Sequence, residues 1–295
     1  MPENSATPRP RKGLLLRLLR ILAWLLMAVA LICVTLYLAF GPAQLFERLK
    51  PPPPLFPGSN STEAPSAPVA AAPVPAPAQA PADSQELVEL MMESIEDIWG
   101  EFLARGDYSY KKPKLVTYRG KVEKPCKDTG TTSGPFYCPG SMSLYLDLDH
   151  LDGLHKNAPE VGDFARSYVV AHEVAHHMQN LVGVNSWIKD MKEGGVKLSG
   201  PEGLMVAQEL LADCLAGSWV GYAQRKYPWV NPDDVDKMLQ TVMAYTQEQG
   251  TIPGKAPMRD PLTHGSLEQR QKWLYTGIET GDPQRCMQLF TGLAQ

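Results

Sequence analysis

Apolar and polar positions divide the chain into an apolar N-terminal segment, a proline-rich segment and a region of helix and strand patterns. Residues 21–46 contain no charged side chain and are strongly apolar, whereas Pro and Ala dominate residues 51–83. From Ser84 onward, apolar residues recur at helical spacing over 84–104 and alternate with polar residues over 142–148. We expect strands at 114–118 and 142–148, followed by helices at 163–182, 202–226, 232–248, 267–276 and 283–293.

This pattern predicts an α+β fold, mainly helical, with a small β-sheet that precedes the helix at 163–182. That helix contains no Pro or Gly, and Asp163 and Gly183 are suited to begin and end it. The strand at 142–148 is a candidate edge strand that could pair with an extended peptide. An ordinary half-buried strand is the alternative.

The apolar segment at 21–46 is long enough to cross a bilayer as a helix. It exceeds the roughly 7–15 apolar residues of a cleavable signal peptide, so we interpret it as a transmembrane signal anchor. Five basic residues precede it and only Arg48 and Lys50 closely follow it, which places the basic N-terminus at 1–20 in the cytoplasm. The sequence therefore predicts a single-pass cell (inner) membrane protein that contacts the lipid bilayer through 21–46.

Composition and charge define the remaining organisation. Residues 47–83 bury too little apolar surface to fold and are expected to form a disordered Pro/Ala-rich linker. Residues 84–295 are expected to form one periplasmic, or otherwise extracytoplasmic, domain. The chain carries a net charge of −4, of which residues 1–84 contribute +3 and the remainder −7. Because no basic stripe with interleaved aromatic residues is present, we expect no nucleic-acid partner.

The helix at 163–182 contains the motif H-E-x-x-H, formed by His172, Glu173 and His176. Residues four apart project from one face of a helix, so the two imidazoles can bind one zinc ion. The adjacent glutamate can then act as general base toward a zinc-activated water. Two unrelated histidines on a solvated helix are the alternative.

A catalytic zinc ion needs a third protein ligand. The extended motif H-E-x-x-H-x-x-G-x-x-H is absent, because Gln179 and Val182 occupy the corresponding positions. Glu209 and Asp213 lie four apart in the next helix, among apolar neighbours. We expect Glu209 to be the third ligand of one zinc ion per chain, and Asp213 to orient a ligating histidine by a hydrogen bond. A solvated carboxylate pair is the alternative.

Other histidines are assigned by their positions. His264 precedes an S-x-x-Q capping box and stands at a helix entrance, where it could donate a hydrogen bond to the developing oxyanion. A structural loop histidine is the alternative reading. His177 points about 100° away from His176 and is interpreted as structural. His150 and His155 are expected in a loop, without a role.

Five cysteines are present, one of which, Cys33, lies in the apolar segment. In an oxidising compartment, Cys126 is expected to pair with Cys138, and a Cys214–Cys286 bridge could form as well. A structural metal site bound by these four cysteines is the alternative, but no C-x-x-C spacing supports it.

Beyond these motifs, the chain resembles the bacterial putative neutral zinc metallopeptidases over about residues 86–290. The resemblance implies a zincin-type zinc peptidase in which His172, Glu173 and His176 match the family's H-E-x-x-H. Glu209 falls in its E-L-x-A-D-C segment. The chain departs from the family at Ala175, often Gly, and at Ser141, usually Asp. The similar segments are 136–139 with 144–147, 162–183, 208–219 and 263–273.

We therefore expect a membrane-anchored zinc metallopeptidase that hydrolyses a peptide or protein substrate, with Glu173 and His264 as catalytic residues. The alternative is a catalytically inactive zinc-binding envelope protein that acts in interaction or assembly. A membrane-embedded protease is disfavoured, because the motif lies more than a hundred residues beyond the apolar segment.

Overall fold

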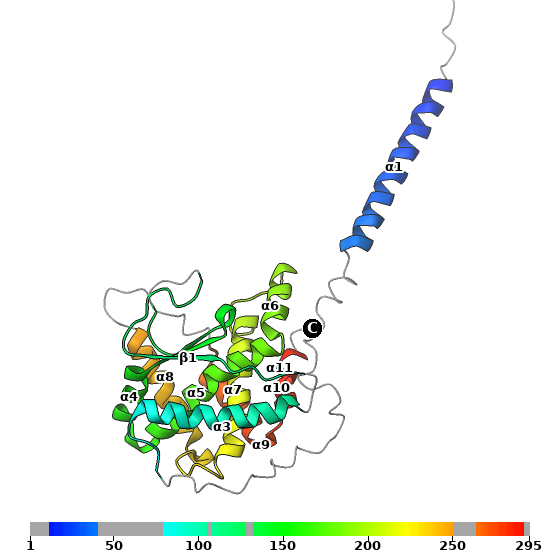
Figure 1. Cartoon of the computed structure of the whole chain (residues 1–295). Helices are drawn as coiled ribbons and strands as arrows, with labels where there is room; N and C mark the ends of the chain where they lie inside the picture. The colour runs from blue at the N-terminus through cyan, green and yellow to red at the C-terminus, as the bar shows by residue number, and fades with distance from the viewer. Residues whose placement is uncertain (1–11, 41–78, 105–107, 128–131, 251–263, 292–295) are drawn as a thin grey trace, which may run out of the picture. The chain divides into compact units, whose positions relative to one another are not determined.

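The computed structural model describes residues 12–40, 79–104, 108–127, 132–250 and 264–291. The chain divides into two units, Met1–Lys50 and Pro51–Gln295. The second unit is mainly helical with one three-stranded sheet, so the α+β class predicted from the sequence is confirmed (Figure 1). Most of the linker predicted at 47–83 lies outside the described residues.

Helix α1 (Lys12–Phe40) is the described element of the first unit. It begins before the apolar segment predicted at 21–46 and ends within it, and residues 41–46 lie outside the described part. Its large apolar side chains between Ile21 and Val34 are exposed. Nowhere in the described residues does a helix have both the length and the apolar character needed to cross a membrane.

The sheet has the order β1-β3-β2, with β3 parallel to β1 and antiparallel to β2. The prediction that the strand at 142–148 lies at an edge is wrong, because this strand is β3 and is central. Its alternating sequence suggested one solvated face, but four of its five residues are buried between its two neighbours. The strand bounds are Lys114–Tyr118 for β1, Phe136–Cys138 for β2 and Ser143–Asp147 for β3.

Helix α5 (Pro159–Leu181) is the element around which the domain is packed. It begins before Asp163, because Pro159 occupies the first helical turn, where its missing N–H is not needed. Asp163 is therefore not the cap that we expected, and it accepts a hydrogen bond from buried Arg166 at 2.5 Å instead. Gly183, with a φ of 86°, follows the helix end as predicted. Helix α5 contacts α3 (Ser84–Ala104), α4 (Leu148–Asn157), α6 (Val184–Glu193), α7 (Leu204–Ala223) and α8 (Val235–Gly250).

Helix α4 corrects the expectation that His150 and His155 lie in a loop, because both are in this helix. The helix begins where β3 ends, and the Asp147 carboxylate caps it by accepting a hydrogen bond from the Asp149 N–H at 3.1 Å. The same carboxylate accepts the N–H groups of two loop glycines, Gly120 and Gly134. One buried carboxylate thus connects the sheet, the helix and the preceding loop.

Helices α7 and α9 (Leu267–Thr280) approach each other with backbone against backbone. A Cβ atom placed on Gly277 would lie 2.0 Å from the Cys214 carbonyl oxygen, and one on Gly217 would lie 2.2 Å from the Leu274 carbonyl oxygen. The capping box predicted at the start of α9 is present. The remaining elements are 3-10 turns at Pro139–Ser141 and Pro232–Asp234, and short helices α10 (Pro283–Cys286) and α11 (Gln288–Thr291).

Candidate metal site

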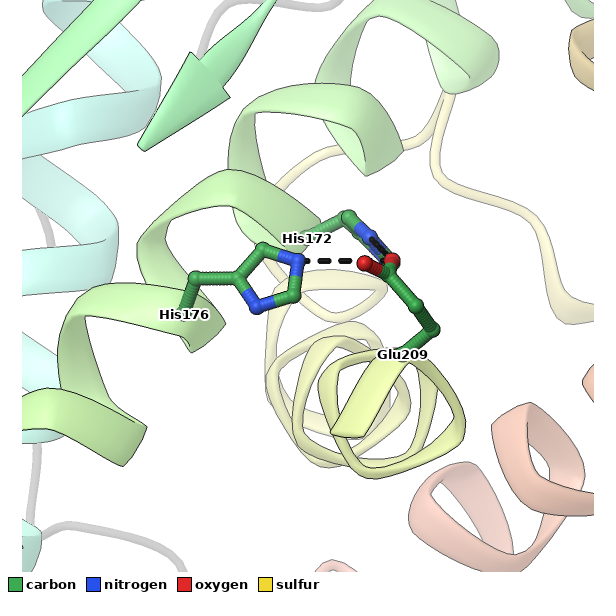
Figure 2. A group of neighbouring side chains, drawn as sticks. All are labelled: His172, His176 and Glu209. Carbon is green, nitrogen blue, oxygen red and sulfur yellow. Dashed lines mark hydrogen bonds and ion pairs between the residues drawn. The ribbon is translucent and has the colours of Figure 1, made fainter. Parts of the chain in front are cut away.

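Two neighbouring helices bring three potential metal ligands together. His172 and His176 lie one turn apart on α5, and Glu209 lies on the facing helix α7. Each residue offers a ligand atom, and these atoms all lie within 4.8 Å of one another (Figure 2). The structure therefore places the three residues named from the sequence in one group that could hold a metal ion.

The donor set and its spacing fit zinc. Two imidazole nitrogens and one carboxylate oxygen are the ligands of many catalytic zinc sites, where metal–ligand distances are about 2.0–2.2 Å. Two tetrahedral ligands at such distances lie about 3.3–3.6 Å apart. The Glu209 Oε2 atom is 3.2 Å from His172 Nε2 and 3.5 Å from His176 Nε2. Glu209 is thus spaced from each histidine as two ligands of one small ion would be.

Glu173 differs from these residues in having no hydrogen-bond or ion-pair partner among the described residues. Together with His176 and Glu209, it lines a cavity of about 130 Å³. Within the described part of the chain, its carboxylate forms no hydrogen bond or ion pair. A carboxylate that borders the candidate metal site without a protein partner is free to exchange a proton with a bound molecule.

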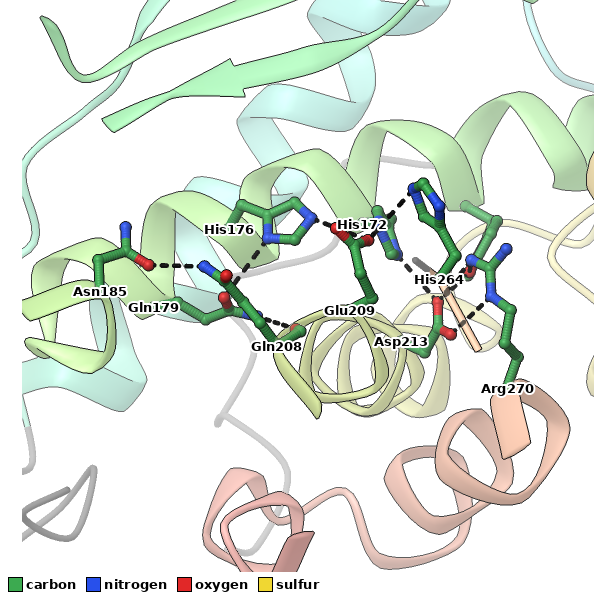
Figure 3. A network of polar contacts seen from close by, with 10 residues as sticks. His172, His176, Gln179, Asn185, Gln208, Glu209, Asp213, His264 and Arg270 are labelled. Carbon is green, nitrogen blue, oxygen red and sulfur yellow. Dashed lines mark hydrogen bonds and ion pairs between the residues drawn. The ribbon is translucent and has the colours of Figure 1, made fainter. Parts of the chain in front are cut away.

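Asp213 lies behind the candidate ligands in a fully buried polar cluster. It accepts a hydrogen bond from His172 Nδ1 at 2.9 Å, which leaves His172 Nε2 facing Glu209. Arg270 of α9 donates to both carboxylate oxygens, at 2.8 and 2.9 Å, and the Tyr168 hydroxyl also donates to Asp213. Figure 3 shows Asp213 between His172 and Arg270. The interaction with His172 is the one expected from the sequence, whereas Arg270 and Tyr168 were not anticipated.

The charges in this cluster shift its ionisation. Burial alone would raise the pKa of Asp213, but the Arg270 guanidinium outweighs it and holds that pKa below its usual range. Burial would lower the pKa of His172, but the hydrogen bonds to Asp213 and Glu209 raise it to about 9. Burial would also raise the pKa of Glu209, but the charge of His176 and the hydrogen bond from His172 hold it well below its usual range. Both carboxylates are therefore ionised at neutral pH, whereas His172 would release a proton on binding a metal.

His264 lies beside this group. It stands two residues before Ser266, the N-cap of α9, and its Nε2 atom is 3.4 Å from Glu209 Oε2. Three imidazoles therefore face one carboxylate oxygen, although His264 is outside the set whose ligand atoms are mutually close (Figure 3). The structure thus brings His264 to the site from a segment far away in sequence.

Gln179 is a residue at the site that sequence reasoning did not assign a role. Its side chain is 0% exposed, and its Nε2 donates to the Gln208 carbonyl oxygen at 2.9 Å. This bond directs Gln179 Oε1 toward His176 Nδ1, 3.4 Å away (Figure 3). An amide oxygen at this position favours a proton on His176 Nδ1 and leaves Nε2 available for a metal. Its position one turn after His176 was the available sequence clue.

His177 lies away from the candidate ligands, in a hydrogen-bonded network. Its Nε2 is 2.5 Å from the Lys111 carbonyl oxygen, and its Nδ1 is 2.9 Å from the Tyr137 hydroxyl oxygen. Burial lowers the pKa of His177, so the neutral ring donates through Nε2 and accepts from Tyr137 through Nδ1. Asn180 donates to the Tyr137 hydroxyl in turn, so this hydroxyl is committed to the network.

The cysteines form the two pairs considered from the sequence. Cys126 is bonded to Cys138, at the end of β2, and Cys214 is bonded to Cys286. The second bond joins α7, one residue after Asp213, to α10 near the C-terminal end. It therefore covalently connects the helix of Glu209 to the end of the domain.

Comparison with known proteins agrees with this geometry. The profile of a family described as putative neutral zinc metallopeptidase matches residues 25–289. Uncharacterized protein YpfJ of Escherichia coli strain K12 is 32% identical over 210 residues, covering 69% of this chain and 71% of the relative. Uncharacterized protein Rv2575 of Mycobacterium tuberculosis strain H37Rv is 35% identical over 207 residues, covering 65% and 66%. No solved structure matches the chain significantly. The chain therefore belongs to the putative neutral zinc metallopeptidase family.

Proposed function

We propose that the chain is a zinc-dependent peptidase of the zincin type, with one zinc ion held by His172, His176 and Glu209. The observation that carries this proposal is the position of Glu173. Its carboxylate has no partner within the described part of the chain and borders the same cavity as two candidate ligands. Zinc binding alone does not require such a group, whereas peptide hydrolysis requires a base at this place.

When bound, zinc supplies Lewis acidity, which polarises the scissile carbonyl and acidifies water. Glu173 accepts the proton of the attacking water on its carboxylate and returns it to the leaving amine. His264 donates a hydrogen bond to the oxyanion that develops on the substrate. Its proximity to Glu209 supports this role, and Tyr137, whose hydroxyl is committed to His177 and Asn180, is a poorer donor.

Asp213 and Gln179 position the two histidines. The side-chain oxygen of each accepts a hydrogen bond from the Nδ1–H of one imidazole, His172 or His176, so that both rings keep Nε2 available for the metal. Because both positioning residues are fully buried, the two rings are held in place by the packed interface between α5 and α7.

Strand β2 is suited to bind the substrate backbone. It is an edge strand that pairs only with β3 in the described sheet. Phe136 and Tyr137 of this strand line the cavity next to Glu173 and His176. We propose that an extended peptide pairs with β2, the role first considered for the strand at 142–148.

The two disulfides support placing the folded domain outside the cytoplasm, because such bonds form and persist in oxidising compartments. Mass measurement after alkylation of unreduced cellular protein tests this placement, since four protected thiols are expected. Anchoring to a lipid bilayer through 21–46 stays a prediction from the sequence. Its test is whether the chain fractionates with membranes.

The proposed function is tested with Glu173→Gln, which preserves shape and removes the base. We expect one zinc ion per chain in both proteins and a fall of roughly 10²–10⁴-fold in hydrolysis of a mixed peptide library for the variant. Equal hydrolysis by the two proteins would refute the mechanism. A wild-type protein that binds zinc but cleaves no peptide would instead favour the inactive zinc-binding alternative.

A further inference from the structure

The cavity beside the candidate metal site is lined in part by the side-chain amides of Asn185 and Gln208, which form its amide wall. Besides Glu173, His176 and Glu209, its described lining also includes Phe136, Tyr137 and Pro139. Its volume of about 130 Å³ is slightly below the roughly 150 Å³ of an engineered cavity that admits benzene. The cavity is therefore large enough for one amino-acid side chain of a substrate whose backbone lies at the metal.

A chain of hydrogen bonds orients the two amides. Gln208 Nε2 donates to Asn185 Oδ1 at 2.8 Å, and Asn185 Nδ2 donates to Asn180 Oδ1 at 3.1 Å. Asn180 Nδ2 then donates to the Tyr137 hydroxyl at 3.0 Å. Figure 3 shows Gln208 and Asn185 joined at the end of the network that includes His176. Because every amide in the series donates in the same direction, none can reverse without breaking a bond.

This orientation leaves hydrogen-bonding capacity at the cavity. Gln208 Oε1 has no hydrogen-bond donor among the described residues, and the side-chain nitrogens of Gln208 and Asn185 each have a second N–H beyond the bond that they already make. The wall can therefore both donate and accept. A carboxamide or hydroxyl group matches this pattern, whereas an apolar group would displace water from these atoms without replacing its hydrogen bonds.

The charge of the lining further narrows the kind of side chain that the cavity can accept. Among the described residues, the cavity lining contains two glutamates, Glu173 and Glu209, and no lysine or arginine. In the zinc-loaded site the charges of the two glutamates offset the two positive charges of the ion, so an acidic side chain would meet no net positive charge. From the amide orientation, the volume and the charge, we propose that this cavity is a specificity pocket for a small neutral polar side chain, such as that of Asn, next to the scissile bond. This inference rests on the proposed function.

The test uses the zinc-loaded full chain and three amino-acid hydroxamates, which bind zinc through the same group and differ only in the side chain. Asn and Leu side chains have nearly the same shape, and Asp adds a charge. By calorimetry we expect the Asn compound to bind at least tenfold more tightly than the Leu compound, a difference of about 1.4 kcal/mol, and the Asp compound to bind most weakly.

The matched variants are Gln208→Leu in the pocket and Gln271→Leu on α9, where the side chain bonds Asp236 instead. Gln208→Leu keeps the backbone carbonyl that orients Gln179, so zinc binding is expected to persist while the Asn preference falls to below threefold. Gln271→Leu should keep the full preference. If Gln208→Leu does not fold, Asn185→Ala removes the other amide of the wall and is expected to weaken the preference as well.

Two failures are distinguishable in this experiment. If the wild type binds no stoichiometric zinc, or no hydroxamate when loaded, the proposed function is wrong and this inference falls with it. If zinc and hydroxamates bind but Leu equals or exceeds Asn, the inference is overturned and the proposed function stands. The inference is also overturned if Gln208→Leu keeps the full preference for the Asn compound.

Discussion

Asp213→Asn tests how the buried cluster behind the candidate ligands controls metal binding. Asp213 is 0% exposed and accepts hydrogen bonds from His172 on one side and Arg270 on the other. The single oxygen of an asparagine amide replaces either Oδ1, which accepts from both His172 Nδ1 and Arg270 Nη2, or Oδ2, which accepts from Arg270 Nε. If it replaces Oδ2, the NH₂ group faces His172 Nδ1 and forces the ring proton onto Nε2, where the metal should bind. If it replaces Oδ1, the NH₂ group faces the guanidinium.

The expected losses of stability and zinc affinity in Asp213→Asn follow from the burial of the groups involved. Arg270 is 6% exposed, so loss of its carboxylate leaves a buried charge without a partner, which destabilises a fold by about 3–5 kcal/mol. Loss of a hydrogen bond that orients a ligating histidine weakens metal binding by about 10–100-fold. That range corresponds to about 1.4–2.8 kcal/mol of binding free energy. Asp213→Asn should therefore show both effects.

Arg270→Gln is the control, because it removes the guanidinium and keeps Asp213 as the acceptor for His172 Nδ1. We expect lower stability in urea unfolding but zinc affinity within about threefold of wild type, measured by competition with a chelator. The double variant Asp213→Asn/Arg270→Gln removes both charges, so its stability should partly recover while its zinc affinity stays low. Wild-type zinc affinity in Asp213→Asn, or an equal loss in Arg270→Gln, would contradict the orienting role.

Three other perturbations address the ligand support, the helix interface and the response to acid. Gln179→Leu should weaken zinc binding about tenfold, because His176 loses the acceptor for its Nδ1 proton, and Gln179→Glu should restore the zinc affinity. A chelator competition measures both, and equal affinities for the wild type and the two variants would exclude a role of Gln179 in metal binding. Gly277→Ala should destabilise the domain by about 1–3 kcal/mol or more, because its methyl group would lie 2.0 Å from a backbone carbonyl oxygen. The control Gly100→Ala on α3 meets nothing within 4 Å and should not have this effect. Thermal unfolding measures the difference, and an unchanged Tm for Gly277→Ala would be inconsistent with the close packing of the two helices. Burial lowers the pKa of His150 to about 4, so the folded protein disfavours the charged ring and its free energy of unfolding falls by about 1–2 kcal/mol between pH 7 and pH 5. Urea unfolding of His150→Phe should show a smaller fall over this range. An identical fall in both proteins would contradict the lowered pKa.

Short-range features of the fold were predictable from sequence. Helix α3 and strand β1 have the predicted bounds, and the capping box of α9 forms as expected, because these features depend on residues within a few positions of one another. The start of α5 was misjudged, since a proline at the first turn competed with Asp163 as the helix start. Helix α4 was missed because its cap, Asp147, comes from the end of a strand.

The sheet shows where local patterns stop being informative. Alternation over 142–148 indicated a strand but not how many neighbours it has, and β2 is only three residues long. Whether a strand is central or at an edge depends on pairing partners distant in sequence. The structure therefore moves the candidate peptide-binding edge from β3 to β2.

The sequence by itself determined which groups could act together within one helix, since helical spacing puts His172 and His176 on one face and sets Glu173 beside them. It also suggested Glu209 and Asp213, because two carboxylates on an apolar helix face are costly to leave without partners. Only the tertiary structure decided that His264 and Arg270 reach this group, that Gln179 supports His176, and that an amide-lined cavity adjoins Glu173. These relations depend on packing between helices, where distances between atoms are set by the whole core and not by spacing along the chain.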